Sequence, residues 1–79
     1  MANSSNIVHQ YFKKEMEGVK IIVKVNPIHW KGTEITVSSD GHVESRDLEF
    51  DEQIFDDLKQ DGFDAASPLE FNLYHTGLA

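Results

Sequence analysis

The chain has 79 residues, a net charge of −7 and no cysteine. This length accommodates one small domain with a limited core, and the absence of cysteine excludes disulfides, thiol catalysis and cysteine-ligated metals. The acidic charge disfavours direct binding to nucleic acid or to anionic membranes. No apolar run approaches the roughly 20 residues of a membrane span, so we expect a soluble, cytoplasmic protein.

The N-terminal segment predicts a tail followed by a helix. Residues 1–5 are small and polar, and we expect them to be disordered, with a single domain over residues 6–79. From Asn6 to Met16, apolar residues recur at a spacing that fits one side of a helix, which Gly18 would end. A strand is the alternative, because β-branched and aromatic residues are common in this segment.

Two following segments have the alternation that is typical of half-buried strands. Residues 19–25, VKIIVKV, place valine and isoleucine on one side, until Pro27 ends the pattern. Residues 33–37 form a second such segment, with Ile35 and Val37 facing inward.

Asp40 and Gly41 predict a two-residue hairpin turn into a third strand over residues 42–50. The apolar positions of this third strand change from odd to even numbers along its length. We therefore expect a bulge near Arg46 and Asp47, where one extra residue would restore the alternation.

The segment after the third strand predicts a helix that begins after Asp51, the capping residue, and ends at Gly62. Phe63 would then pack on Leu58, the contact that accompanies a Schellman ending. Its clustered aspartates also resemble part of a calcium-binding loop. With Gly62 at the sixth loop position, however, Lys59 would occupy the third, where calcium needs an oxygen ligand.

The four histidines lack the spacing that places two imidazoles on one helix face. No nucleophile motif or phosphate-binding glycine loop is present. We therefore predict no metal site, no cofactor and no catalytic residue.

The C-terminal segment is compatible with two structures. Residues 67–70, SPLE, are typical of a helix start, whereas Leu69, Phe71 and Leu73 alternate as in a strand, and we favour the strand. The predicted fold is α+β, in the order α-β-β-β-α-β. It has a mainly antiparallel sheet of three to four strands, one face of which is covered by one or two helices.

The charge is unevenly distributed along the chain. Residues 1–39 carry a net charge of +2 and residues 40–79 a net charge of −9, which favours a partner with a basic patch. Trp30 is the only tryptophan and falls in a predicted loop, where it could bind a partner or close the end of the core. The candidate protein-interaction residues are His29, Trp30, Lys31, Asp51, Glu52, Asp56, Asp57 and Asp61.

These features favour a non-catalytic, acidic protein-interaction module that acts as an accessory or regulatory subunit. A first alternative is a DNA mimic that inhibits a nucleic-acid-binding protein, with Asp47 and Glu49 adding to the acids of the helix. A further alternative is a small ligand-binding protein or enzyme whose site forms at a dimer interface. A homodimer is compatible with all three, because a chain of this size often gains stability by self-association.

Overall fold

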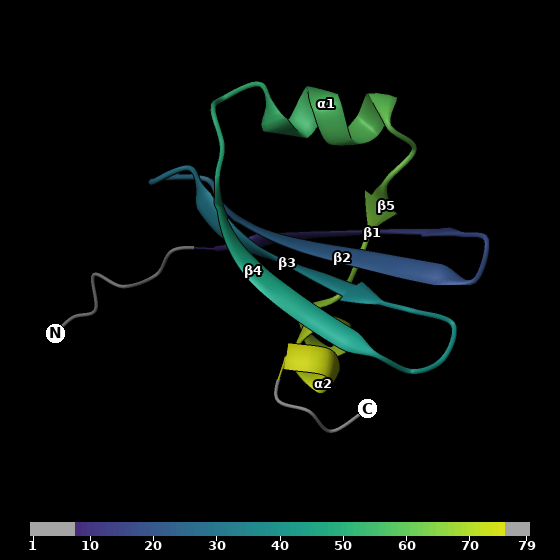
Figure 1. Cartoon of the computed structure of the whole chain (residues 1–79). Coiled ribbons are helices and arrows are strands. Elements are labelled where there is room, and N and C mark those ends of the chain that lie inside the picture. Colours follow the sequence, from purple (N-terminus) through teal and green to yellow (C-terminus); the bar gives the residue numbers. More distant parts are fainter. Residues whose placement is uncertain (1–7, 76–79) are drawn as a thin grey trace, which may run out of the picture.

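A computed structural model describes residues 8–75, which form a five-stranded antiparallel sheet and two helices (Figure 1). The elements are β1 (Gln10–Met16), β2 (Val19–Asn26), β3 (Lys31–Val37), β4 (Val43–Glu49), α1 (Ile54–Gln60), β5 (Asp64–Ala65) and α2 (Pro68–His75). The predicted α+β class is thus confirmed, although the order and number of the elements differ. The tail predicted over residues 1–5 lies outside the described residues. No helix within residues 8–75 is long and apolar enough to cross a membrane.

The helix predicted up to Met16 is wrong, because this segment forms strand β1. Tyr11 packs with the cluster under α2 and Phe12 with the cluster under α1, so neighbouring residues are both partly buried. A strand that is covered on both faces lacks a clean alternation, which explains the misassignment. Glu17 and Gly18, with φ of 51° and 80°, form the turn to β2 and fit a two-residue hairpin loop.

The sheet has the order β4-β3-β2-β1-β5, and each strand is antiparallel to its neighbours. One helix lies on each face, as Figure 1 shows, and not on one face as predicted. The central strand β2 therefore supplies both cores: Ile22 is buried with Ile35 and Phe71, whereas Val23 is buried with Leu58.

The predicted strands β2, β3 and β4 are confirmed, but β2 is buried on both faces and not half-buried, and the bulge in β4 is wrong. The pairing of β3 with β4 runs without interruption from Lys31 and Glu49 to Val37 and Val43. Apolar residues at both odd and even positions fit β4, because each face of the sheet carries a core. The loop from β3 to β4 spans residues 38–42, so it is longer than the two-residue turn that was predicted.

Helix α1 ends as predicted but begins differently. The Asp51 carboxylate accepts a hydrogen bond from the Gln53 backbone N–H at 2.9 Å, which forms a turn before the helix, and the cap position falls at Gln53. At the other end, Gly62 has φ of 88°, and the Phe63 N–H donates to the Leu58 carbonyl at 3.0 Å. This Schellman ending aims the chain from α1 toward β5.

The strand favoured for the C-terminal segment is wrong, because this segment forms helix α2. The Ser67 hydroxyl accepts a hydrogen bond from the Glu70 N–H at 3.1 Å and caps the helix. Phe71 is buried with 1% of its surface exposed, whereas Leu69 and Leu73 are 70% and 39% exposed. Their alternation in the sequence therefore does not correspond to a shared buried face.

Candidate protein-binding site

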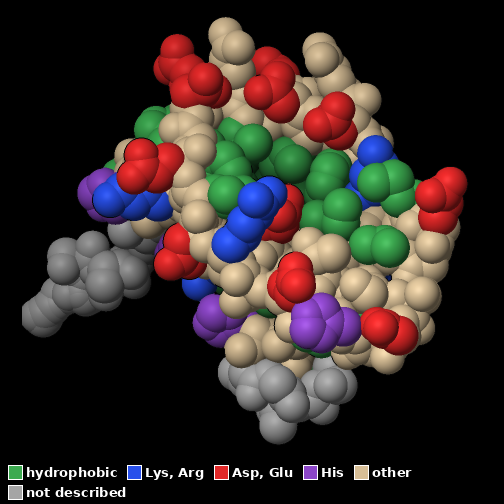
Figure 2. All heavy atoms as spheres, in the orientation of Figure 1, with side chains coloured by type: hydrophobic (Ala, Val, Ile, Leu, Met, Phe, Trp, Pro, Cys, Tyr) green, Lys and Arg blue, Asp and Glu red, His purple; other side chains and the backbone are tan. Residues whose placement is uncertain are grey.

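Acidic side chains gather on the outer surface of α1 and the turn before it. Between residues 51 and 64 the chain has six acidic residues and one lysine. The five acidic residues predicted to bind a partner all lie here and are exposed: Asp51, Glu52, Asp56, Asp57 and Asp61. Figure 2 shows acidic side chains on the α1 side of the molecule, with an apolar band below them.

An open groove of about 600 Å³ lies beside this acidic surface. Phe12, Phe55 and Phe63 contribute its apolar lining, and its charged lining residues are Asp56, Asp64 and Lys59. The groove thus combines aromatic surface with a lining of two acids and one lysine, and its net negative charge suits an apolar side chain flanked by basic residues.

The aromatic residues of the groove remain half-buried because α1 is short. Leu58 is the one buried residue of α1, while Phe55 is partly buried, with its ring centre 5.7 Å from that of Phe12. The Lys14 ammonium lies 5.9 Å from the centre of the Phe63 ring. Together with Lys59, which lines the groove, two cations therefore lie near its aromatic surface.

Phe12, Phe55, Phe63 and Asp64 were missing from the predicted site. Phe12 belonged to the misassigned helix, and Phe63 was expected only to support the end of α1. Asp64 lies in β5, a strand of two residues that pairs with β1. A pairing this short leaves no alternation in the sequence, so no sequence pattern indicated this position.

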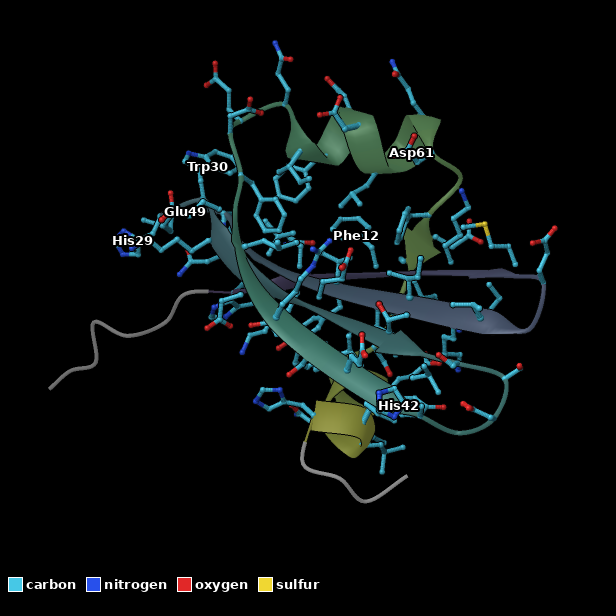
Figure 3. All side chains as sticks on the ribbon, in the orientation of Figure 1. Phe12, His29, Trp30, His42, Glu49 and Asp61 are labelled. Atoms are coloured by element: carbon cyan, nitrogen blue, oxygen red, sulfur yellow. The ribbon has the colours of Figure 1, made fainter. Side chains whose placement is uncertain are left out.

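The loop from β2 to β3 divides its predicted binding residues between two environments. Trp30, with φ of 57°, is half-buried, and its ring meets the Phe55 ring edge-on at 5.8 Å. His29 and Lys31 are exposed, and His29 points away from α1 in Figure 3. Trp30 therefore combines partial core burial with a position near the acidic surface, whereas His29 lies outside it.

The acids of the predicted DNA mimic lie on both faces of the sheet. Asp47 accepts a hydrogen bond from the Thr33 hydroxyl at 3.2 Å, and the register places this pair on the same face as Lys24 and α2. The acids of α1 lie on the opposite face. The carboxylates proposed for a DNA mimic are therefore divided between the two faces of the sheet.

A second hollow, of about 490 Å³, lies next to Asp47. Its charged lining is mixed, because Lys24 and Lys31 accompany Asp47 and Glu49. Such a surface has no preference for an anion or a cation, and it lacks the aromatic lining of the groove beside α1.

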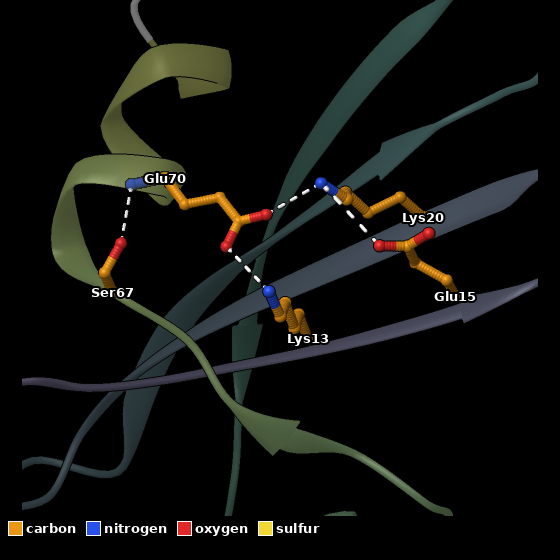
Figure 4. Close-up of polar contacts among 5 residues, drawn as sticks. All are labelled: Lys13, Glu15, Lys20, Ser67 and Glu70. Atoms are coloured by element: carbon orange, nitrogen blue, oxygen red, sulfur yellow. Dashed lines mark hydrogen bonds and ion pairs between the residues drawn. The ribbon is translucent and has the colours of Figure 1, made fainter.

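The two side chains with shifted pKa values hold α2 on the sheet. Glu70 accepts hydrogen bonds from Lys20 at 2.7 Å and from Lys13 at 3.2 Å (Figure 4). The bond from Lys20 lowers the pKa of Glu70, and the bond to Glu70 raises the pKa of Lys20. Both shifts reflect an ion pair within the fold.

Within residues 8–75, no group of three or more histidine or acidic side chains could hold a metal ion. No protein-family model matches the chain, and no curated protein or solved structure is significantly similar to it.

Proposed function

We propose that this protein is a non-catalytic interaction module that binds another protein through the face that carries α1. The observation that carries this proposal is the groove beside α1, where three phenylalanines adjoin exposed acids. The partner segment would place an apolar side chain against Phe12, Phe55 and Phe63, and basic side chains against Asp56 and Asp64. The protein would act as an accessory or regulatory subunit of that partner.

The charge of the α1 face supports a basic partner and a fast, salt-dependent encounter. Opposite charges steer association and fix the orientation of the partner, while the apolar contact contributes most of the affinity. We therefore expect moderate affinity that decreases with salt but retains an apolar component.

Capture of proteins from native-host lysate by the immobilised chain tests this proposal, with bound proteins eluted by increasing salt. We expect a specific partner at low salt and a strongly reduced yield for the double variant Asp56→Asn/Asp64→Asn. The matched control, Glu17→Gln/Glu49→Gln, removes the same charge at exposed positions elsewhere and should retain the partner.

Two results would contradict the proposal. One is the absence of any specific partner at low salt. The other is equal capture by both double variants, which would show that the partner binds elsewhere. Thermal unfolding of each variant shows that a reduced yield does not come from loss of the fold.

A further inference from the structure

The outer edge of β4 is long and has no partner strand within residues 8–75. β4 lies at the end of the sheet, and its seven residues pair with β3 without a bulge. The strand contains no proline and no lysine, two residues that often block an edge. The opposite edge strand, β5, has only two residues. Within residues 8–75, β4 therefore offers the longer edge to which another strand could be added.

The ladder between β3 and β4 identifies which backbone groups face outward. The Ser38 N–H donates to the His42 carbonyl at 2.8 Å at one end, and the Phe50 N–H donates to the Trp30 carbonyl at 2.7 Å at the other. Hydrogen-bonded pairs alternate in an antiparallel ladder, so the even-numbered residues of β4 bond to β3. The odd-numbered residues direct their backbone groups outward: Val43, Ser45, Asp47 and Glu49.

We infer that a second copy of the chain binds this edge by antiparallel pairing of β4 with β4. Ser45 would lie opposite Ser45 of the second copy, and Val43 opposite Asp47 of the second copy, through hydrogen-bonded pairs. Glu44 would then lie opposite Arg46 of the second copy. The two-fold symmetry forms this ion pair twice. Both ion pairs fall at non-hydrogen-bonded positions of the antiparallel ladder, where opposite side chains are closest.

The charges of β4 select this register over its neighbours. Only the odd-numbered residues of β4 have outward backbone groups. The second strand can therefore shift only to registers in which odd-numbered residues of one copy pair with odd-numbered residues of the other. One such step places Arg46 opposite Arg46, and the step in the other direction places Glu44 opposite Glu44. Like charges directly opposite each other are destabilising. The register centred on Ser45 instead pairs opposite charges, and this self-complementarity indicates a second copy as the occupant.

Arg46 is bonded to β3 but keeps exposed surface for this contact. Its Nε donates to the Glu34 carboxylate at 2.9 Å, while its side chain remains 70% exposed. A guanidinium has further N–H donors in a fixed plane, so Arg46 could bind Glu34 within its chain and Glu44 of the second copy together. The net charge of −7 on each chain opposes association, and we expect a weak dimer that forms at high protein concentration.

Sedimentation equilibrium of the full chain over a concentration series tests the interface. We expect association of the wild-type chain, and association at least about tenfold weaker for Glu44→Arg, because each of two attractive pairs becomes repulsive. The matched control Glu49→Arg changes the net charge equally, but its position would face Gly41 of the second copy. The control should associate at least as well as the wild-type chain.

A mixture of two single variants supplies the complementary test. In Glu44→Arg positions 44 and 46 are both positive, and in Arg46→Glu both are negative. The mixture should therefore form a heterodimer more readily than either variant associates alone. Circular dichroism shows whether each variant is folded. A wild-type chain that stays monomeric up to its solubility limit would overturn the inference, as would equal weakening by Glu44→Arg and Glu49→Arg.

Amide hydrogen exchange tests the register itself. On raising the protein concentration, the amides of Val43, Ser45 and Asp47 should become protected. Those of Glu44 and Arg46 should be protected at all concentrations, because they bond to β3. Concentration-independent exchange at all odd-numbered positions would overturn the proposed pairing. These experiments do not involve α1, so their outcome is independent of the proposed partner of the α1 face.

Discussion

Glu70 joins helix α2 to two strands, and this role has a consequence for stability at acidic pH. Its bonds to Lys20 and Lys13 lower the pKa of Glu70 below the ordinary value of 4.5. A carboxyl group whose pKa is depressed by folding stabilises the folded state above its unfolded pKa. This contribution is lost as the pH falls below about 4.5 and through the lower, folded-state pKa.

We expect Glu70→Gln to lower the free energy of unfolding by about 1 kcal/mol at neutral pH, because the ion pairs are only partly shielded from water. The variant should also lose part of the decrease in stability between neutral and acidic pH. Urea unfolding at a series of pH values measures both effects, with the exposed Glu52→Gln as control. An unchanged pH profile for Glu70→Gln would show that the ion pairs add nothing.

Gly62 is required by its backbone conformation and not by space. A Cβ at this position would lie 3.8 Å from the Lys14 Cε, an ordinary contact, but φ of 88° disfavours any L side chain. We expect Gly62→Ala to destabilise the domain by about 1 kcal/mol. Gly62→Asn should have a smaller effect, because asparagine tolerates this region better. Equal stability of wild type and Gly62→Ala in urea unfolding would contradict this account.

Gly32 shows the opposite requirement, which the sequence did not indicate. A Cβ there would overlap the Lys24 carbonyl oxygen and approach the Phe50 ring to 2.8 Å. The missing side chain therefore allows Phe50 to pack on the sheet beside Val25.

At the scale of elements, α2 tests whether helical or strand periodicity governs the C-terminal segment. We expect Phe71→Ala to reduce the free energy of unfolding by about 3 kcal/mol, because it opens a cavity under a buried ring. Leu69→Ala should change it by less than about 0.5 kcal/mol, because this side chain is 70% exposed. Chemical unfolding of the two variants measures the difference, and effects of similar size would contradict the helical arrangement.

The elements that were predicted correctly carry local signals. Strand β2 is rich in valine and isoleucine and ends before Pro27, and α1 stops at a glycine that is followed by Phe63. Strand β1 could not be predicted from local signals, because Tyr11 and Phe12 are partly buried by two different helices that are distant in the sequence. Short-range periodicity cannot reveal such a division between two cores.

The candidate site was predictable to a similar extent. The acids of α1 were identified because a helix with exposed aspartates could be read from local spacing. The groove was not, since it depends on β1 and β5 coming together beside α1. Phe12 and Asp64 are distant in the sequence, and only the pairing of these two strands places them along one hollow.

At the scale of the whole molecule, the sheet separates two small cores. Ile22, Ile35 and Phe71 form the buried part of one core, and Val23, Val25 and Leu58 that of the other. With so few fully buried residues, stability depends on both helices staying in place. Docking of a partner on the α1 face, or of a second chain on β4, would add apolar or backbone contacts that the isolated domain lacks.

The distribution of aromatic residues makes the two faces separately visible to spectroscopy. Trp30, the only tryptophan, lies against Phe55 on the α1 side, whereas both tyrosines, Tyr11 and Tyr74, pack with the core under α2. Selective excitation of the tryptophan therefore reports on the α1 face, and tyrosine signals report on the α2 face. The natural sequence thus contains an intrinsic fluorophore for each core, so the loosening of one face can be distinguished from that of the other without any label.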